Sequence, residues 1–388
     1  MTNDVPPTAI TMWLADPLPA DVSKSLQRLA QSADVRQVVV LPDVHLAGEV
    51  CNGTAIATRE LIYPVAVGGD IGCGMLAVAI NLPAEDLAKA ATASGVLSGL
   101  QHAIPINKHA RANVAAQLPA DLHDRELSNS TLERLKTRDG LFQLGTLGSG
   151  NHFVEFQSDN EGQLWLMLHS GSRGMGQAIT AQHLKSTFVT NSGLGALEAA
   201  AQAGQDYLAD LNWAIDYAQE NRLAMARRVD ALLASLFGTS IDWQTLIDCQ
   251  HNHVRRETHG GESFWVHRKG ALPAAEGEPG VIPGSMGSRS YHVTGRGLAQ
   301  ALRSSSHGAG RLFARQQARR LTSRGELQRQ MRGVWFDERH AEGLRDEAPS
   351  VYKEIGRVMR AQRELTRIER ELHPVLVYKG VNRPHRPS

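Results

Sequence analysis

The sequence has few cysteines and no long apolar run. Its three cysteines, Cys51, Cys73 and Cys249, are too few and too scattered for the disulfide framework of a secreted domain. We therefore expect a reduced, cytoplasmic setting. No basic start followed by an apolar run opens the chain, so no signal peptide is expected. No stretch of about 18 apolar residues predicts a membrane span.

An excess of charge of one sign is also missing. Lys and Arg number 41 and Asp and Glu number 40, which gives a formal net charge of +1 over 388 residues. Without a global positive field, any contact with RNA must use a local patch. The hydrophobic content of 42% is ample for a large core, in one big domain or in two.

Short apolar runs recur along the chain, and a glycine-rich turn or a polar residue follows several of them. Such runs are typical of buried strands that deliver functional groups at their ends. The runs are Gln37–Leu41, Tyr63–Val67, Met75–Ile80, Leu164–Leu168 and Phe264–Val266.

Helical patterns lie between these runs. The Ala- and Leu-rich stretch from Leu197 to Phe237 predicts a helical hairpin, inserted at about residues 195–237. Lys353–Leu372 has apolar residues at helical spacing. We predict an α+β fold with a β-sheet core, active-site turns at strand ends and outer helices. One domain over residues 1–388 is the simplest reading, because any cut would split the motifs described next.

Asp70 and Cys73 lie three residues apart in a turn with glycines at 69, 72 and 74. Those glycines permit a tight turn in which a carboxylate and a thiolate face one point. His152, His169 and His251 each adjoin a residue suited to fixing an imidazole ring. Together these residues predict one or two transition-metal ions, with a thiolate able to bridge two cations. Mg²⁺ or Ca²⁺ would need more oxygen ligands, and structural Zn²⁺ would need cysteine pairs.

Each of these residues, taken singly, has a simpler interpretation. A lone buried Cys usually packs as a small hydrophobe, a lone His is usually a satisfied core group, and Asp70 alone suits a turn cap. All five in turns of this type make the simple interpretation unlikely. Cys249 and Cys51 are interpreted as packing residues, because no glycine-shaped turn surrounds Cys249.

The segment His307–Arg311 places a histidine directly before two closely spaced glycines. Their backbone N–H groups can approach an oxyanion, and Arg311 could open a helix behind them. The Lys-Ser/Thr pair of a P-loop is missing. His307 is a candidate general acid or base, metal ligand or phosphoryl nucleophile. Further candidates for neutralising phosphate charge are Arg173, Arg268, Lys269 and Arg289.

In this order and density, the motifs resemble the RtcB family of GTP-dependent RNA ligases over nearly the whole chain. The matching segments are Pro42–His45, Val67–Met75, Leu144–Glu155, Leu168–Gly174, His251–Val254, Arg268–Ala271, Pro283–Gly287, Ser306–Arg311 and Lys379–Gly380. A turn similar to Gly-Lys-Gly usually follows the first motif in the family, whereas this chain has Leu46-Ala47-Gly48-Glu49. Together with a shorter, less basic region before Gly145 and a tail from Val381 to Ser388, this departure gives the chain a resemblance to shorter bacterial paralogues.

The resemblance implies an enzyme that joins an RNA 3′-phosphate or 2′,3′-cyclic phosphate end to a 5′-hydroxyl end, in RNA repair or tRNA splicing. It implies GTP, two Mn²⁺ ions and a catalytic histidine, His307, that carries GMP. Asp70, Cys73 and His152 would bind one ion, and Cys73, His169 and His251 the other. The implied nucleotide contacts are Asn151, His152, Phe153, Val154, Glu155, His251, Asn252, Pro283, Gly284, Ser285, Met286, Ser290, His307, Gly308, Ala309, Gly310 and Lys379.

Two alternatives remain open from the sequence. One is a dinuclear metal-dependent phosphodiesterase or phosphatase that acts on RNA ends without guanylylation. The other is a module that senses RNA ends without turnover, although Cys73 and His307 are both intact. A monomer is expected, with no membrane partner, and an archease-like activator is a possible partner.

Overall fold

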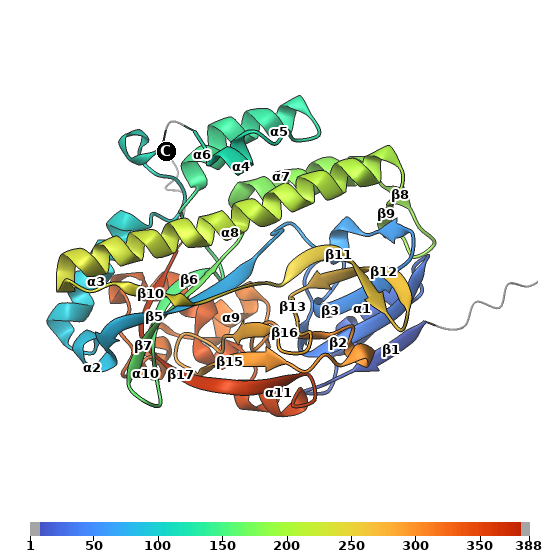
Figure 1. Ribbon diagram of the computed structural model, residues 1–388. Coiled ribbons are helices and arrows are strands. Elements are labelled where there is room, and N and C mark those ends of the chain that lie inside the picture. Colours follow the sequence, from blue (N-terminus) through green and yellow to red (C-terminus); the bar gives the residue numbers. More distant parts are fainter. Residues whose placement is uncertain (1–7, 116, 382–388) are drawn as a thin grey trace, which may run out of the picture.

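The computed structural model describes residues 8–115 and 117–381. Two large sheets form its centre (Figure 1). The seven-stranded antiparallel sheet has the order β10 (Ile241–Gln250), β5 (Gly74–Pro83), β7 (Gln163–Ser170), β6 (Phe153–Asp159), β17 (Thr366–Lys379), β15 (Ser290–Gly295) and β14 (Pro279–Ile282). Its outer strands β10 and β14 contact each other, so the sheet curls nearly into a barrel.

The five-stranded sheet has the order β1 (Ala9–Met12), β2 (Val35–His45), β3 (Asn52–Thr58), β12 (Glu262–Lys269) and β11 (Asn252–His259). Only β1 and β2 pair in parallel. Two small sheets join β13 (Ala271–Pro273) to β16 (Ser304–Ser306), and β9 (Gly195–Glu198) to β4 (Leu61–Ile62) and β8 (Phe188–Val189). The β13–β16 pair leads into the turn that carries His307.

The helices cover the outside of the sheets (Figure 1). They are α1 (Ala20–Ala30), α2 (Ala84–Leu87), α3 (Ala90–Ala103), α4 (Ala120–His123), α5 (Ser130–Leu135), α6 (Leu141–Gln143), α7 (Arg173–His183), α8 (Gln202–Phe237), α9 (Arg315–Leu321), α10 (Arg324–Gln330) and α11 (Ile355–Ala361). A ten-residue 3₁₀ segment, η6 (Glu338–Glu347), packs against α9 and α10. No described helix has both the length and the apolar character needed to cross a bilayer.

The core explains the apolar run in β5. Leu76, Val78 and Ile80 pack on one face of the strand with α3 and α8, while Met75 and Ala77 pack on the other face with Met167 of β7. Because both faces are buried, the strand reads as a continuous apolar run rather than an alternating one. The predicted α+β class, with turns at the strand ends, is confirmed. The domain limits 1–388 stay a prediction.

The predicted hairpin at 195–237 is wrong. Gly195–Glu198 forms strand β9, and Gln202–Phe237 is one continuous helix of 36 residues, about 54 Å long at the usual rise. No Gly or Pro occurs from 205 to 237, so nothing provides a turn, and the helix ends where Gly238 takes a left-handed conformation with φ +66°. Helices α3 and α7 pack along it.

Three local predictions also differ from the structure. Lys353–Leu372 is helical only over Ile355–Ala361, because strand β17 then begins at Thr366 and pairs with β15 and β6. Tyr63–Val67 is not a strand but a 3₁₀ turn, Pro64–Ala66. Strand β2 continues past Pro42 to His45 through an irregularity in its pairing with β3.

Helix α8 packs directly on the glycine-rich turn before β5. Gly72 has φ +68°, and a Cβ there would lie 2.9 Å from Cα of Ile215 and 3.0 Å from Cβ of Ala218. Gly238 has nearly the same φ, but a Cβ there would meet no atom within 4 Å. The same substitution at these two glycines therefore separates the energetic cost of backbone strain from the cost of overpacking.

We predict that Gly72→Ala destabilises the protein more than Gly238→Ala. Both substitutions carry the left-handed cost of about 1–2 kcal/mol, and only Gly72→Ala adds about 1–3 kcal/mol of overpacking against α8. Denaturant titrations of the two variants and wild type would measure the free energies of unfolding. Equal losses would show that α8 does not constrain this turn.

Candidate active site

Five side chains from distant parts of the chain converge at one end of the seven-stranded sheet. Cys73 Sγ lies 3.2 Å from Nε2 of His169 and 3.5 Å from Nε2 of His152. Nε2 of His152 lies 2.9 Å from Oδ2 of Asp70, and Nε2 of His169 lies 3.4 Å from Nε2 of His251. Two candidate metal-binding groups result, Asp70–Cys73–His152 and Cys73–His169–His251, and Cys73 belongs to both.

The sheet order explains this convergence. Cys73 directly precedes β5, His152 directly precedes β6, His169 lies near the end of β7, and His251 follows β10. Since β10, β5, β7 and β6 are consecutive neighbours in the sheet, these positions meet at one edge. Phe153 and Met75 both pair with His169 across the ladder, which fixes the register.

Hydrogen bonds orient two of the imidazoles. Nδ1 of His152 donates to the Leu147 carbonyl at 3.1 Å, and Nδ1 of His169 donates to the Asn151 carbonyl at 3.1 Å. Their Nε2 lone pairs then point into the cluster, towards the Cys73 sulfur and the Asp70 carboxylate. This arrangement is typical of metal-binding histidines, which donate their other ring N–H to a carbonyl or carboxylate.

The charges in the cluster favour a cation between these groups. Burial lowers the pKa of His169 and of His251 well below the usual range, so both rings are expected to be neutral, each with one N–H and one free lone pair. Asp70 adds a carboxylate to the same cluster, with Oδ2 at 2.9 Å from Nε2 of His152. Lone pairs and a carboxylate at such short separations repel unless a positive charge lies among them. Nitrogen, sulfur and one carboxylate together suit a transition metal.

Helix α8 holds the turns from behind. Arg222 is buried, pairs with Asp248 at 2.6 Å, and donates to the carbonyls of Gly72 at 2.9 Å and Ser170 at 3.1 Å. The buried Asn221 Oδ1 accepts from the N–H groups of Gly145 at 2.7 Å and Thr146 at 3.2 Å. Neither residue was predicted from the sequence. Both lie in the polar run Gln219–Arg222, and nothing in that run distinguishes its two buried members from its two partly exposed ones.

His307 lies beside these candidate metal-binding groups, with its ring centroid 4.7 Å from that of His251. Oδ2 of the buried Asp43 accepts from Nδ1 of His307 at 2.6 Å and from its backbone N–H at 3.1 Å. With the proton held on Nδ1, Nε2 keeps its lone pair. Arg311 does not open a helix as expected, since α9 begins only at Arg315.

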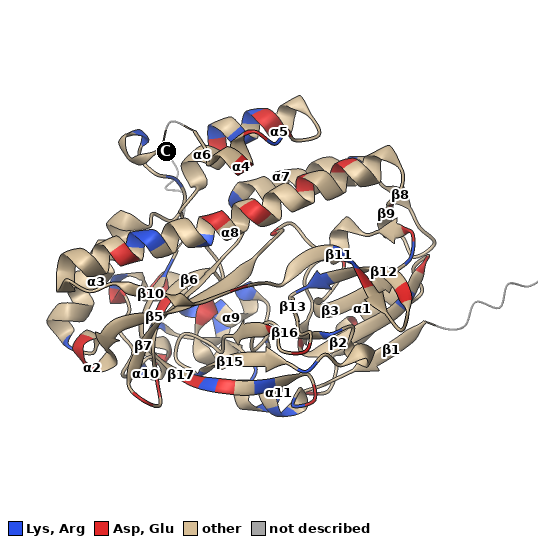
Figure 2. Ribbon diagram, in the orientation of Figure 1, with Lys and Arg blue, Asp and Glu red and all other residues tan. Residues whose placement is uncertain are grey.

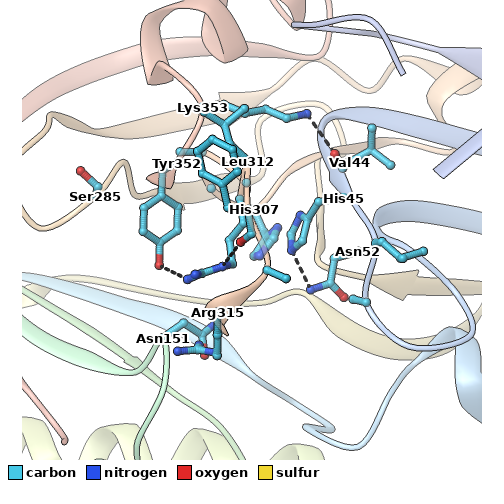
Figure 3. Close-up of a pocket in the computed structure, with 18 of the residues that line it drawn as sticks. Val44, His45, Asn52, Asn151, Ser285, His307, Leu312, Arg315, Tyr352 and Lys353 are labelled. Atoms are coloured by element: carbon cyan, nitrogen blue, oxygen red, sulfur yellow. Dashed lines mark hydrogen bonds between the residues drawn. The ribbon is translucent and has the colours of Figure 1, made fainter. Parts of the chain in front are cut away.

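A cavity of about 680 Å³ opens beside His307 (Figure 3). In the figure, Ser285, Tyr352, Asn151 and Arg315 lie on one side of His307, and His45 and Asn52 on the other. The predicted nucleotide contacts that line it are Asn151, Phe153, Glu155, Pro283, Gly284, Ser285, Met286, His307, Gly308, Ala309, Gly310 and Lys379.

The other predicted nucleotide contacts do not line the cavity. His152 and His251 belong to the metal groups, and Val154 is buried in the apolar core. Asn252 binds the Asp70 carbonyl and the Gly270 N–H, and Ser290 accepts from the Gly284 N–H at 3.3 Å. These two side chains therefore shape the turns around the cavity.

The cations at the cavity are not those expected from the sequence. Arg173, Arg268, Lys269 and Arg289 do not line it, whereas Arg311, Arg315, Lys353 and Lys379 do. Arg268 is buried against Glu257, and Arg289 pairs with Glu371 at 3.0 Å. Lys269 donates to the carbonyls of Ala47 at 2.8 Å and Val50 at 2.7 Å, so it holds the Leu46–Glu49 loop.

One buried carboxylate gathers four groups of the cavity wall. Glu347 accepts from Lys379 at 2.6 Å, Tyr352 at 2.6 Å, Arg315 at 2.6 Å and Arg311 at 3.2 Å. Burial opposes ionisation, yet Lys379, Arg315 and Arg311 lower the pKa of Glu347 to about 2. By contrast, burial raises the pKa of Glu155 to about 8, despite the opposing effects of Gln157 and Lys379.

Comparison with known proteins gives one family. Residues 25–380 match the family model described as tRNA-splicing ligase RtcB. The chain is 36% identical to an RNA-splicing ligase RtcB of Escherichia coli strain K12, covering 96% of this chain and 97% of that protein. It is 30% identical to an RNA-splicing ligase RtcB of Mycobacterium tuberculosis, covering 89% and 97% respectively. The chain therefore belongs to the RtcB family.

Proposed function

We propose that this chain is an RNA ligase that joins RNA 3′-phosphate or 2′,3′-cyclic phosphate ends to 5′-hydroxyl ends, using GTP and two Mn²⁺ ions. Family membership and the names of the relatives support ligation of RNA. The observation that carries the proposal is the position of His307, which is oriented by Asp43 and lies next to two donor groups that share Cys73.

His307 is the proposed nucleophile. Its Nε2 attacks the α-phosphorus of GTP, a phosphorus–nitrogen bond forms, and pyrophosphate leaves. Asp43 holds the Nδ1 proton and stabilises the charge that the ring gains, which is the role of the carboxylate in a serine-protease triad. A 2′,3′-cyclic phosphate end is first opened by water, which leaves a 2′-hydroxyl and a 3′-phosphate. GMP then passes from His307 to the RNA 3′-phosphate, the 5′-hydroxyl attacks that activated phosphate, and GMP is released.

Asp70, Cys73, His152, His169 and His251 would hold the ions, and their donor set fits such a role. Divalent cations bound there would stabilise charge that develops on phosphate oxygens. Lys379, Arg315 and the N–H groups of the Gly308–Gly310 turn line the adjoining cavity and are suited to the nucleotide phosphates and base. A cytoplasmic location, a monomeric state and an archease-like activator stay predictions.

We predict that wild type, incubated with Mn²⁺ and α-labelled GTP, retains label after denaturing electrophoresis, and that His307→Ala retains none. Asp43→Asn should slow labelling by roughly 10²–10⁴-fold, because the ring loses the group that fixes its tautomer. The control is His373→Ala, since His373 is half exposed and does not line the cavity.

Label on His307→Ala would refute the nucleophile assignment. If wild type takes no label but opens a 2′,3′-cyclic phosphate, the phosphodiesterase alternative is correct instead.

The shared thiol makes a prediction about metal stoichiometry. Cys73→Ser should weaken Mn²⁺ binding at both positions by roughly 10-fold or more, whereas Asp70→Asn should weaken one position only. Titration calorimetry would give the stoichiometry, and electron paramagnetic resonance would detect the coupled ion pair. Cys249→Ser is the matched control, because Cys249 is partly buried nearby but belongs to neither donor group. Two unchanged sites in Cys73→Ser would contradict the bridge.

Glu347→Gln should raise the KM for GTP in the labelling reaction by about 10-fold, because hydrogen bonds to charged groups contribute roughly 1.5–3 kcal/mol. The variant removes the negative charge to which Lys379, Arg311 and Arg315 bind. Asp346→Asn is the control, since Asp346 binds Arg315 at 2.9 Å but does not contact Lys379 or Tyr352. Equal KM changes in both variants would argue against a specific role of Glu347. Melting temperatures separate this effect from misfolding.

A further inference from the structure

Arginine is concentrated in one short part of this nearly neutral chain. Residues 311–335 contain seven arginines, Arg311, Arg315, Arg319, Arg320, Arg324, Arg329 and Arg332, and only one acidic residue, Glu326. The chain as a whole has a formal net charge of only +1. The segment is therefore a local positive patch of the kind that a protein without a global positive field needs in order to bind a polyanion.

The arginines of the patch fall into two groups. Arg311, Arg315 and Arg319 pair with Asp346 or Glu347 at the end of η6. Arg320, Arg324, Arg329 and Arg332 are exposed and make no salt bridge within the part of the chain that the structure describes. The second group, Arg320, Arg324, Arg329 and Arg332, is called the outer arginines below. Their charges are available to a ligand.

The patch continues from the cavity. Leu312, Phe313, Ala314, Arg315 and Gln317 line the cavity, and α9 starts at Arg315. Arg320 lies five residues along this helix, roughly 7 Å further at 1.5 Å per residue. Phosphates of a stacked strand follow one another about every 3.4 Å. The outer arginines are therefore positioned to meet phosphates from about the second nucleotide beyond a reacting end.

Charge alone would also suit an acidic protein, so the choice of partner depends on the continuity with the cavity. The proposed reaction brings an RNA end to His307, and the rest of that strand must leave the cavity along some surface. A strand that leaves past Arg315 meets α9 and α10, whose arginines are coloured in Figure 2. An acidic protein surface has no comparable reason to begin at the cavity.

We propose that the single-stranded RNA next to the joint lies along α9 and α10, with its phosphates neutralised by the outer arginines. This inference rests on the proposed ligase function and adds to it a path for the substrate. The contacts are to the backbone, so they carry no base sequence. They increase affinity in proportion to the number of phosphates that reach the helices.

The test compares two triple variants that remove equal charge. One is Arg320→Gln/Arg324→Gln/Arg329→Gln. The control is Arg125→Gln/Arg134→Gln/Arg138→Gln, three exposed arginines next to or on α5, a helix in which Figure 2 shows blue and red together. Fluorescence anisotropy would measure binding of a 20-nucleotide RNA with a 5′-hydroxyl end between 50 and 200 mM salt. In the patch variant, the slope of log K against log salt should fall by about 2, at about 0.7 per phosphate contact.

The control variant should bind as wild type does. A dinucleotide, which ends before the outer arginines, should be joined equally by all three proteins. Label transfer from GTP to His307 should be unchanged in the patch variant. Wild-type affinity and slope in the patch variant would overturn the RNA path, as would loss of the GMP label in that variant. A wild-type protein that takes no GMP would refute the proposed ligase instead, and the anisotropy slope would still test the path.

Discussion

Nitrogen and sulfur lone pairs converge in one small buried volume at the edge of the seven-stranded sheet, and most of the surrounding structure serves to hold them there. The imidazoles of His152 and His169 donate their Nδ1 protons to backbone carbonyls, so their Nε2 atoms face the Cys73 sulfur. Such an arrangement is unfavourable without a positive charge in its centre. A rigid framework must therefore oppose the repulsion, because groups this close would otherwise move apart.

Helix α8 supplies much of that framework. Its Arg222 and Asn221 bind backbone groups of three separate turns, at Gly72, at Gly145 and Thr146, and at Ser170. One continuous helix fixes these turns relative to one another in a way that two short helices would not. The helix also packs on Gly72 so closely that no side chain fits there. The same segment is thus both a covering layer and a support of the candidate metal site.

The cavity has a comparable support on its far side. Glu347 holds Lys379, Tyr352, Arg315 and Arg311 from behind, and Asp43 fixes His307. Each buried carboxylate offsets nearby positive charge or orients a donor, so the groups facing the cavity are ordered before any ligand binds. Pre-ordered groups of this kind reduce the cost of binding a highly charged nucleotide. From the same wall, α9 and α10 lead away from the cavity. They carry Arg320, Arg324 and Arg329, which make no salt bridge within the part of the chain that the structure describes.

The sequence by itself determined the α+β class, the four strands β2, β5, β7 and β12, and the residues that the fold gathers at the two candidate metal groups and at His307, because tight turns with Gly, Asp, Cys and His leave a local signal. Tertiary structure alone decided the rest. Whether residues 202–237 fold as one helix, whether Thr366–Leu372 is helix or strand, and which cations face the cavity all depend on long-range packing and pairing. Arg268 and Arg311 are both arginines near glycines in the sequence. Arg268 is buried and forms an ion pair with Glu257, whereas Arg311 lines the cavity. No local pattern records which carboxylate a cation will meet, because that partner comes from a distant part of the chain.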